Sequence, residues 1–210
     1  MHYLSTRNNQ LKESFLNILF RGLSKDGGLF LPSEWPTISL ENLQGKSYQE
    51  VAHSIIYPYI QDDISYDDLQ LIINTAYESF DHKKIAPLLN IDQNKYILEL
   101  FYGPTFAFKD YALQFLGSLF SYLLNQSKKK ITVLGATSGD TGSAAINAFK
   151  GKDDIEVFIL HPHNNVSEVQ RRQMTTVEEN NIHNFAIEGN FDDCQNIVKE
   201  LFVDEEIQSK

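Results

Sequence analysis

Apolar positions in the first part of the chain recur at helical spacing. The segments 13–23 and 48–60 each carry one apolar stripe, and this period predicts two amphipathic helices. Ser65 is expected to cap a third helix, whose apolar residues share one face, namely Leu69, Ile72, Ile73, Ala76 and Phe80. Residues 1–95 are therefore expected to form a mainly helical N-terminal domain, and no catalytic constellation is found in it.

From residue 96 onward, short apolar runs alternate with runs at helical spacing. The pattern predicts strands at 97–101, 131–134, 155–160 and 185–187. It predicts helices at 111–124, 141–149, 167–179 and from 191 onward. Alternation at this length is typical of a parallel sheet covered by helices on both faces. The expected fold class is α/β, with residues 96–210 forming the α/β domain.

Residues with capping chemistry mark several of the predicted helix ends. Ser167 and Gln170 have the spacing of a capping box, and Gly151 is placed to end the helix that precedes it. The basic run 128–130 suits the C-terminal end of a helix, because the helix dipole favours cations there. This run is interpreted as a solvated helix end.

Composition limits the classes of function. The chain has 210 residues, 42% of them hydrophobic, and a formal net charge of −10. No apolar run could span a bilayer, and the negative charge argues against general binding to nucleic acid. Cys194 is the single cysteine and no Cys/His cluster has zinc spacing, so neither a disulfide nor a metal is expected. Residues 1–7 lack the features of a secretory signal, so a cytoplasmic protein is expected.

The first segment with candidate chemistry is 100–110, in which Lys109 follows the apolar residues Phe106, Ala107 and Phe108. A lysine reacts with an aldehyde only as the neutral amine, and apolar surroundings disfavour its charge. Aromatic neighbours alone do not establish such a role, since most lysines are solvated surface residues. From these residues alone, a surface lysine remains the more common interpretation.

The second segment with candidate chemistry is the glycine-rich turn 135–142, placed between a predicted strand and a predicted helix. It matches neither the dinucleotide motif nor the nucleotide P-loop, so a plain connection is as good an interpretation as a ligand loop. Backbone N–H groups at a helix start attract anions, and the turn adds three hydroxyls, from Thr137, Ser138 and Thr141. Asp140 argues against a dianionic phosphate. A carboxylate is the better match, and the two segments should converge at the ends of neighbouring parallel strands.

Both segments, together with 22–32 and 187–195, closely resemble the threonine synthases, which are pyridoxal-phosphate enzymes of fold type II, the tryptophan-synthase-β type. The resemblance covers nearly the whole chain. It implies a lyase of threonine biosynthesis that converts O-phospho-L-homoserine and water to L-threonine and phosphate. It also implies that Lys109 carries pyridoxal 5'-phosphate as a Schiff base and, once freed, moves protons between substrate carbons.

The resemblance further assigns roles within the turn. Thr137, Ser138, Gly139 and Thr141 are expected to hold the substrate's α-carboxylate. Asp140 stands where the wider superfamily has an asparagine that contacts the cofactor's ring hydroxyl. Asp110, directly after the lysine, is interpreted as a structural residue at the start of a helix.

Other parts of the expected site are not found in the sequence. Segment 143–210 contains no candidate loop for the cofactor's phosphate and no partner for its ring nitrogen. Threonine synthases continue beyond residue 210, so the chain is expected to be an N-terminal portion that is inactive by itself. Arg171, Arg172, His161 and His163 could contact the substrate's phosphate, but adjacent arginines point in different directions on a helix, which favours a charged helix face.

Two alternatives remain open from the sequence. Another β-elimination or β-replacement enzyme of the same fold would have similar segments, and residue chemistry alone does not exclude its substrates. If the chain naturally ends at residue 210, a non-catalytic binding module becomes the better interpretation. The oligomeric state is not encoded in any recognised pattern.

Overall fold

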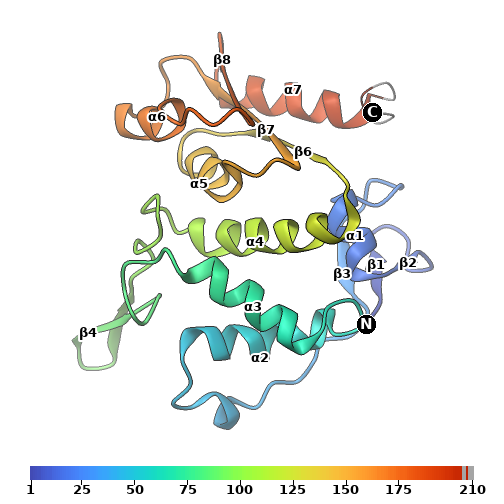
Figure 1. Cartoon of the computed structure of the whole chain (residues 1–210), viewed down its shortest axis with the longest axis vertical. Coiled ribbons are helices and arrows are strands. Elements are labelled where there is room, and N and C mark those ends of the chain that lie inside the picture. The colour runs from blue at the N-terminus through green and yellow to red at the C-terminus, as the bar shows by residue number, and fades with distance from the viewer. Residues whose placement is uncertain (205–206, 208–210) are drawn as a thin grey trace. The chain divides into compact units, whose positions relative to one another are not determined.

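The structure is a computed structural model, and it describes residues 1–204 and 207 (Figure 1). Internal contacts divide the chain into two compact units, Met1–Thr75 and Ala76–Lys210. The sequence predicts a last helix from residue 191 onward. Of the residues at its C-terminal end, 205, 206 and 208–210 lie outside the described residues. No helix among those described is long and apolar enough to cross a membrane.

The first unit begins with a small antiparallel sheet of order β2-β1-β3, made of β1 (Tyr3–Ser5), β2 (Lys12–Glu13) and β3 (Phe30–Pro32). Between β2 and β3 lies α1 (Phe15–Arg21), whose N-cap Ser14 accepts a hydrogen bond from the N–H of Asn17. The helical pattern therefore predicted α1 correctly. The strands are two or three residues long, too short to produce a recognisable alternation.

The rest of the first unit is helical. A short 3-10 helix, Leu40–Leu43, precedes α2 (Tyr48–Ile60) and α3 (Tyr66–Tyr77). Ser47 and Glu50 form a reciprocal capping box at α2, and the Ser65 hydroxyl accepts from the N–H of Asp68 at α3. The bounds of α2 coincide with the predicted segment because a cap marks its start and an apolar stripe continues through it.

In the second unit, the strand predicted at 97–101 does not join the parallel sheet. It is instead part of an antiparallel hairpin of β4 (Leu88–Asp92) and β5 (Lys95–Leu98). Asn94 has a φ of 57° in the connecting turn, a conformation that asparagine tolerates. All residues of both strands are exposed, whereas parallel strands are buried on both faces. The expectation that the lysine segment follows a strand of the parallel sheet was wrong.

The parallel sheet has three strands in the order β6-β7-β8: Ile131–Ala136, Ile155–Pro162 and Ile182–Ile187. The helix α5 (Asp140–Phe149) connects β6 to β7, and α6 (Glu168–Thr175) connects β7 to β8. Because β6, β7 and β8 follow one another in order across the sheet, right-handed crossovers place α5 and α6 on the same face of the sheet. The last helix, α7 (Phe191–Val203), contacts β6 and β7 from the other face (Figure 1). The predicted α/β fold is confirmed, with three parallel strands rather than four.

The remaining long helix, α4 (Asp110–Ser127), packs against α5. Gly117 permits a close approach, because a Cβ at this position would lie 2.5 Å from the carbonyl oxygen of Ala148. Lys128 ends α4 in the left-handed conformation with a φ of 54°, which agrees with the interpretation of the basic run as a helix end. Gly151, with a φ of 69°, follows the C-cap of α5.

Candidate functional site

The lysine segment is folded around the carboxylate of Asp110, the first residue of α4. Asp110 is fully buried, and its two carboxylate oxygens accept hydrogen bonds from the N–H and the hydroxyl of Thr105, each at 2.8 Å. A Cβ at residue 103 would lie 2.5 Å from the Cβ of Asp110, so only glycine fits there. These contacts agree with the structural interpretation of Asp110 and show how it shapes the loop.

Lys109 is the N-cap residue of α4 and is half-buried. Its Nζ lies 4.3 Å from the centroid of the Phe108 ring, an arrangement that attracts an ammonium group. Phe106 and Phe108 are 68% and 58% exposed, and only Ala107 is buried. In this chain the two aromatic rings therefore do not form the enclosed apolar surroundings that their sequence position suggested.

The glycine turn is held together from within by Thr137. Its side chain is 2% exposed, and its hydroxyl oxygen accepts hydrogen bonds from the N–H groups of Gly139 and Gly142, both at 2.9 Å. Gly139 has a φ of 147°, which favours glycine, and a Cβ at residue 142 would lie 2.6 Å from the sulfur of Met174. Thr137 thus acts as the internal support of the turn.

Three other side chains of the turn face solvent: those of Ser138, Asp140 and Thr141. The hydroxyls of Ser138 and Thr141 have no hydrogen-bond partner among the described residues, and the N-cap Gly139 supplies no side-chain acceptor. Of the first N–H groups of α5, that of Gly142 donates to Thr137, whereas those of Asp140 and Thr141 have no partner among the described residues. Helix N-termini with such N–H groups attract anions. The exposed hydroxyls are available to add donors to the same place.

The helix α6 contacts both loops through two glutamines. The side-chain amide of Gln170 donates to a carboxylate oxygen of Asp140, and that of Gln173 donates to the carbonyl of Thr105 at 3.1 Å. Residues three apart lie on the same side of a helix, so one side of α6 joins the glycine turn to the lysine segment. This link replaces the expected convergence at neighbouring parallel strands.

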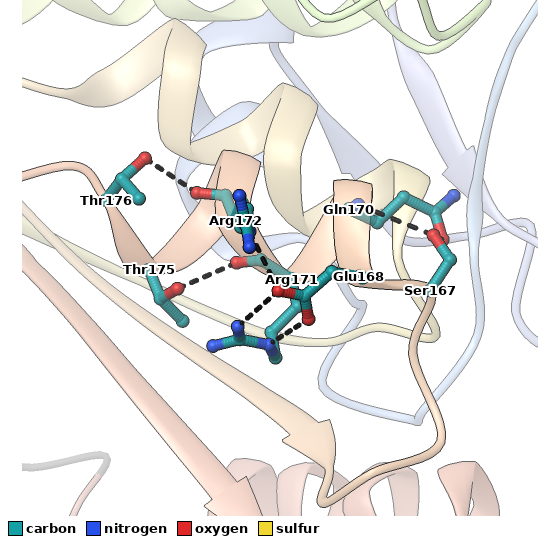
Figure 2. A network of polar contacts seen from close by, with 7 residues as sticks. All are labelled: Ser167, Glu168, Gln170, Arg171, Arg172, Thr175 and Thr176. Carbon is teal, nitrogen blue, oxygen red and sulfur yellow. Dashed lines mark hydrogen bonds and ion pairs between the residues drawn. The ribbon is translucent and has the colours of Figure 1, made fainter.

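The two glutamines were not recognised as site residues from the sequence, although their spacing on a predicted helix was visible. Gln170 was assigned to a capping box with Ser167. The Ser167 hydroxyl donates to the Gln170 side chain at 2.8 Å and accepts from the N–H of Gln170 at 3.4 Å. Figure 2 shows these two residues side by side at the start of α6. The cap by Ser167 is confirmed. The reciprocal hydrogen bond of a capping box, from the N–H of Ser167 to the Gln170 side chain, is not formed, because the side-chain amide of Gln170 contacts the Ser167 hydroxyl and Asp140 instead.

The two arginines of α6 share one carboxylate (Figure 2). Arg171 binds Glu168 through two hydrogen bonds of 2.9 Å, and Arg172 binds it through one of 2.7 Å. Hydrogen bonds first from Arg171 and then from Arg172 lower the pKa of Glu168 from 4.5 to about 2. The helix ends at Thr175 rather than at 179, and the hydroxyls of Thr175 and Thr176 donate back to the carbonyls of the two arginines.

Known proteins resemble this chain over nearly all of its length. Residues 2–77 match the family described as "Threonine synthase N terminus". Threonine synthase from Pseudomonas aeruginosa is 47% identical over 208 residues, which cover 98% of this chain and 44% of the relative. Threonine synthase from Saccharomyces cerevisiae is 45% identical over 226 residues, which cover 99% of this chain and 44% of the relative.

Solved structures give the same result. The pyridoxal-phosphate-bound threonine synthase of Brucella melitensis matches with a TM-score of 0.90 and 47% identity, covering 98% of this chain and 45% of that one. The threonine synthase of Escherichia coli matches with a TM-score of 0.85 and 33% identity, covering 100% of this chain and 48% of that one.

The fold and its two loops define an α/β protein of fold type II, the tryptophan-synthase-β type. Sequence identity and structural similarity both extend over nearly the whole chain. The chain belongs to the threonine synthase family. It spans 44% of the length of the two curated relatives described above, which it matches over their N-terminal portion.

Proposed function

We propose that this chain forms the N-terminal part of a lyase that converts O-phospho-L-homoserine and water to L-threonine and inorganic phosphate. The observation that carries the proposal is that one side of α6 connects the lysine segment to the N-terminus of α5, where the N-cap residue Gly139 supplies no side-chain cap. Family membership at 47% identity supports the same reaction. A cytoplasmic location is part of the proposal, and the single buried cysteine, Cys194, is compatible with it.

Pyridoxal 5'-phosphate is the proposed cofactor, and the chemistry of the exposed groups fits it. Lys109 provides the only amine in the 100–110 segment. The neighbouring turn offers the hydroxyls of Ser138 and Thr141, which have no partner among the described residues. When bound, the cofactor supplies an electron sink that stabilises negative charge on the substrate's α and β carbons. Lys109 is only partly buried, which is compatible with access of the cofactor to its amine.

The chain's own residues have distinct proposed roles. Lys109 holds the cofactor through Nζ and, when released, accepts and returns protons at that atom. The hydroxyls of Ser138 and Thr141, with the first N–H groups of α5, bind the substrate's carboxylate. Asp140, which accepts a hydrogen bond from Gln170, contacts the cofactor's ring hydroxyl in this proposal. The buried Thr137 and Gly139 serve by keeping the turn in its conformation.

The proposed function is tested with the complete protein of which we propose this chain to be the N-terminal part. Supplied with pyridoxal phosphate, it is expected to develop a visible absorption band and to form threonine and phosphate in equal amounts from O-phosphohomoserine. Residues 1–210 alone are expected to form neither product. A complete protein that binds the cofactor but releases no threonine would contradict the proposed reaction, and one that fails to bind the cofactor would contradict the enzyme class.

Ser138→Ala and Thr141→Ala are expected to lower kcat/KM for O-phosphohomoserine by roughly ten- to a hundredfold, because each removes one hydrogen bond to a charged carboxylate. Bound cofactor should change little. Thr132→Ala, an exposed threonine on β6 away from the turn, is the matched control. Asp140→Asn should leave substrate binding largely intact and shift the cofactor's absorption. Wild-type kcat/KM in both alanine variants would mean that the carboxylate binds elsewhere.

A second candidate is another elimination enzyme of the same fold. This candidate stays open because the chain also matches a protein named "Threonine synthase-like 2" from Xenopus laevis, 36% identical over 214 residues. A panel of phosphorylated and acetylated amino acids separates the candidates: formation of threonine supports the first, and a keto acid with ammonia supports the second. A protein that binds these compounds without turnover would be a binding module.

A further inference from the structure

A separate cavity of about 340 Å³ lies at the carboxyl ends of β7 and β8, against α6. Its polar lining comes from six side chains, those of His161, His163, Asn164, Arg171, Thr175 and Asn184. Pro162, Val166 and Ala186 complete the wall. The cavity therefore brings Arg171 together with both histidines that precede α6, whereas Arg172 does not line it.

The cavity lies on a different side of α6 from the two loops. Arg171 and Thr175 are four residues apart and share one side of the helix. At about 100° per residue, that side is turned roughly 150° from the side that carries Gln170 and Gln173. The cavity is therefore lined by a side of α6 that does not carry the two glutamines.

Two buried polar atoms at this cavity have no hydrogen-bond partner within the part of the chain that the structure describes: Nδ1 of His161 and Oδ1 of Asn184. His161 is 5% exposed. The pairing of β7 with β8 places His161 and Asn184 on the same face of the sheet, because Ile159 is the register partner of Asn184. Buried polar groups normally have partners, so this pair indicates that a polar molecule belongs in the cavity.

The chemical type of each unpartnered atom determines which group of a ligand can bond to it. The amide nitrogen of Asn184 donates to the carbonyl of Met174 at 3.0 Å, so its Oδ1 is an acceptor that needs a donor. Nδ1 of His161 can supply a donor. With Nδ1 of His161 as the donor, a ligand that satisfies both atoms accepts one hydrogen bond and donates one.

The charged groups around the cavity include both signs. Arg171 and Arg172 share the single carboxylate of Glu168, so one guanidinium charge is left over. At the mouth, Nδ1 of His163 lies 2.9 Å from the carboxylate of Glu188, which is 90% exposed. The low pKa of Glu168, about 2, keeps its carboxylate ionised and both arginines engaged near neutral pH. Arginine at the wall favours a planar or tetrahedral oxyanion.

We propose that this cavity binds a tetrahedral oxyanion that carries a P–OH group, with inorganic phosphate as the simplest example. Arg171 and His161 donate to its oxygens, and Asn184 accepts from its hydroxyl. Sulfate has the same shape and no hydroxyl near neutral pH, so it leaves Asn184 without a donor. A phosphate monoester dianion likewise has no P–OH group. Comparing it with inorganic phosphate therefore shows whether the cavity binds free or esterified phosphate. This proposal is independent of the proposed function.

Calorimetric titration of the purified protein with phosphate, at constant ionic strength, tests the proposal. Phosphate is expected to bind, with sulfate and a phosphate monoester each weaker by about tenfold or more, because a buried acceptor stays unpaired. Arg171→Gln should weaken phosphate binding by about tenfold or more. Arg172→Gln is the matched control, because Arg172, like Arg171, pairs with Glu168 but does not line the cavity. Equal losses in the two variants, or equal binding of sulfate, would overturn the proposal.

Backbone amide chemical shifts of the unmodified protein locate the ion without any substitution. Phosphate is expected to shift the amides of His161, of residues 163–166 and of residues 184–186. Shifts confined to 137–142 would place the ion at the N-terminus of α5 and would overturn the assignment to this cavity. The two results also distinguish this proposal from the proposed carboxylate site.

Discussion

Lys109→Ala is expected to abolish covalent attachment of pyridoxal phosphate and to lower turnover of O-phosphohomoserine by on the order of 10³-fold or more, because one amine both holds the cofactor and transfers protons. The fold should persist. The Lys109 side chain is half-buried, and the contact identified for it is the ring of Phe108. Unfolding free energy should therefore change by about 0.5 kcal/mol or less.

Borohydride reduction followed by peptide mapping is the measurement that checks this assignment. In the unsubstituted protein the pyridoxyl label should appear on Lys109 alone, and it should disappear in Lys109→Ala. Lys130→Ala, an exposed lysine beyond the end of α4, serves as the control and should keep both label and activity. A label on another lysine would contradict the assignment of Lys109. The visible absorption band would still show whether the protein binds the cofactor.

Asp110→Ala is expected to have the largest effect on stability, about 2–4 kcal/mol of unfolding free energy, because it leaves the buried N–H and hydroxyl of Thr105 without an acceptor. The same substitution frees the loop that precedes Lys109, so the affinity for pyridoxal phosphate should fall as well. Urea denaturation followed by circular dichroism measures the first effect, and titration with the cofactor measures the second.

Thr105→Val provides a milder comparison, since it removes one of the two hydrogen bonds and keeps the side-chain shape. Its cost should be about half that of Asp110→Ala. Asp153→Ala, an exposed acidic residue before β7, is the control and should be close to neutral. If Asp110→Ala unfolds at the same urea concentration as the control, the buried carboxylate does not stabilise the loop.

Local sequence predicted most of the helices. The cap at Ser47 and the unbroken apolar stripe after it determine α2, whose bounds agree with the predicted segment. The caps at Ser65 and Ser167 and the left-handed end at Gly151 are likewise confirmed. These features depend on residues within one or two helical turns of each other, and the sequence contains all the information that they require.

The sequence also located the two loops of the candidate site, from the lysine after an apolar run and the glycines between a strand and a helix. It did not reveal their internal supports. Asp110 was assigned to the start of a helix, and the structure adds its hydrogen bonds to Thr105. Thr137 was expected among the substrate ligands, and the structure gives its hydroxyl two backbone partners within the turn.

Taken by itself, the sequence determined the α/β class, the positions of the helices and the two chemically distinctive loops, because each follows from periodicity or from neighbouring residues. Only the tertiary structure decided that β5 pairs with β4, that Gln170 and Gln173 join the two loops, and that His161 and Asn184 meet at one cavity. Side chains tens of residues apart come together through strand register and helix orientation, and no local pattern encodes that geometry.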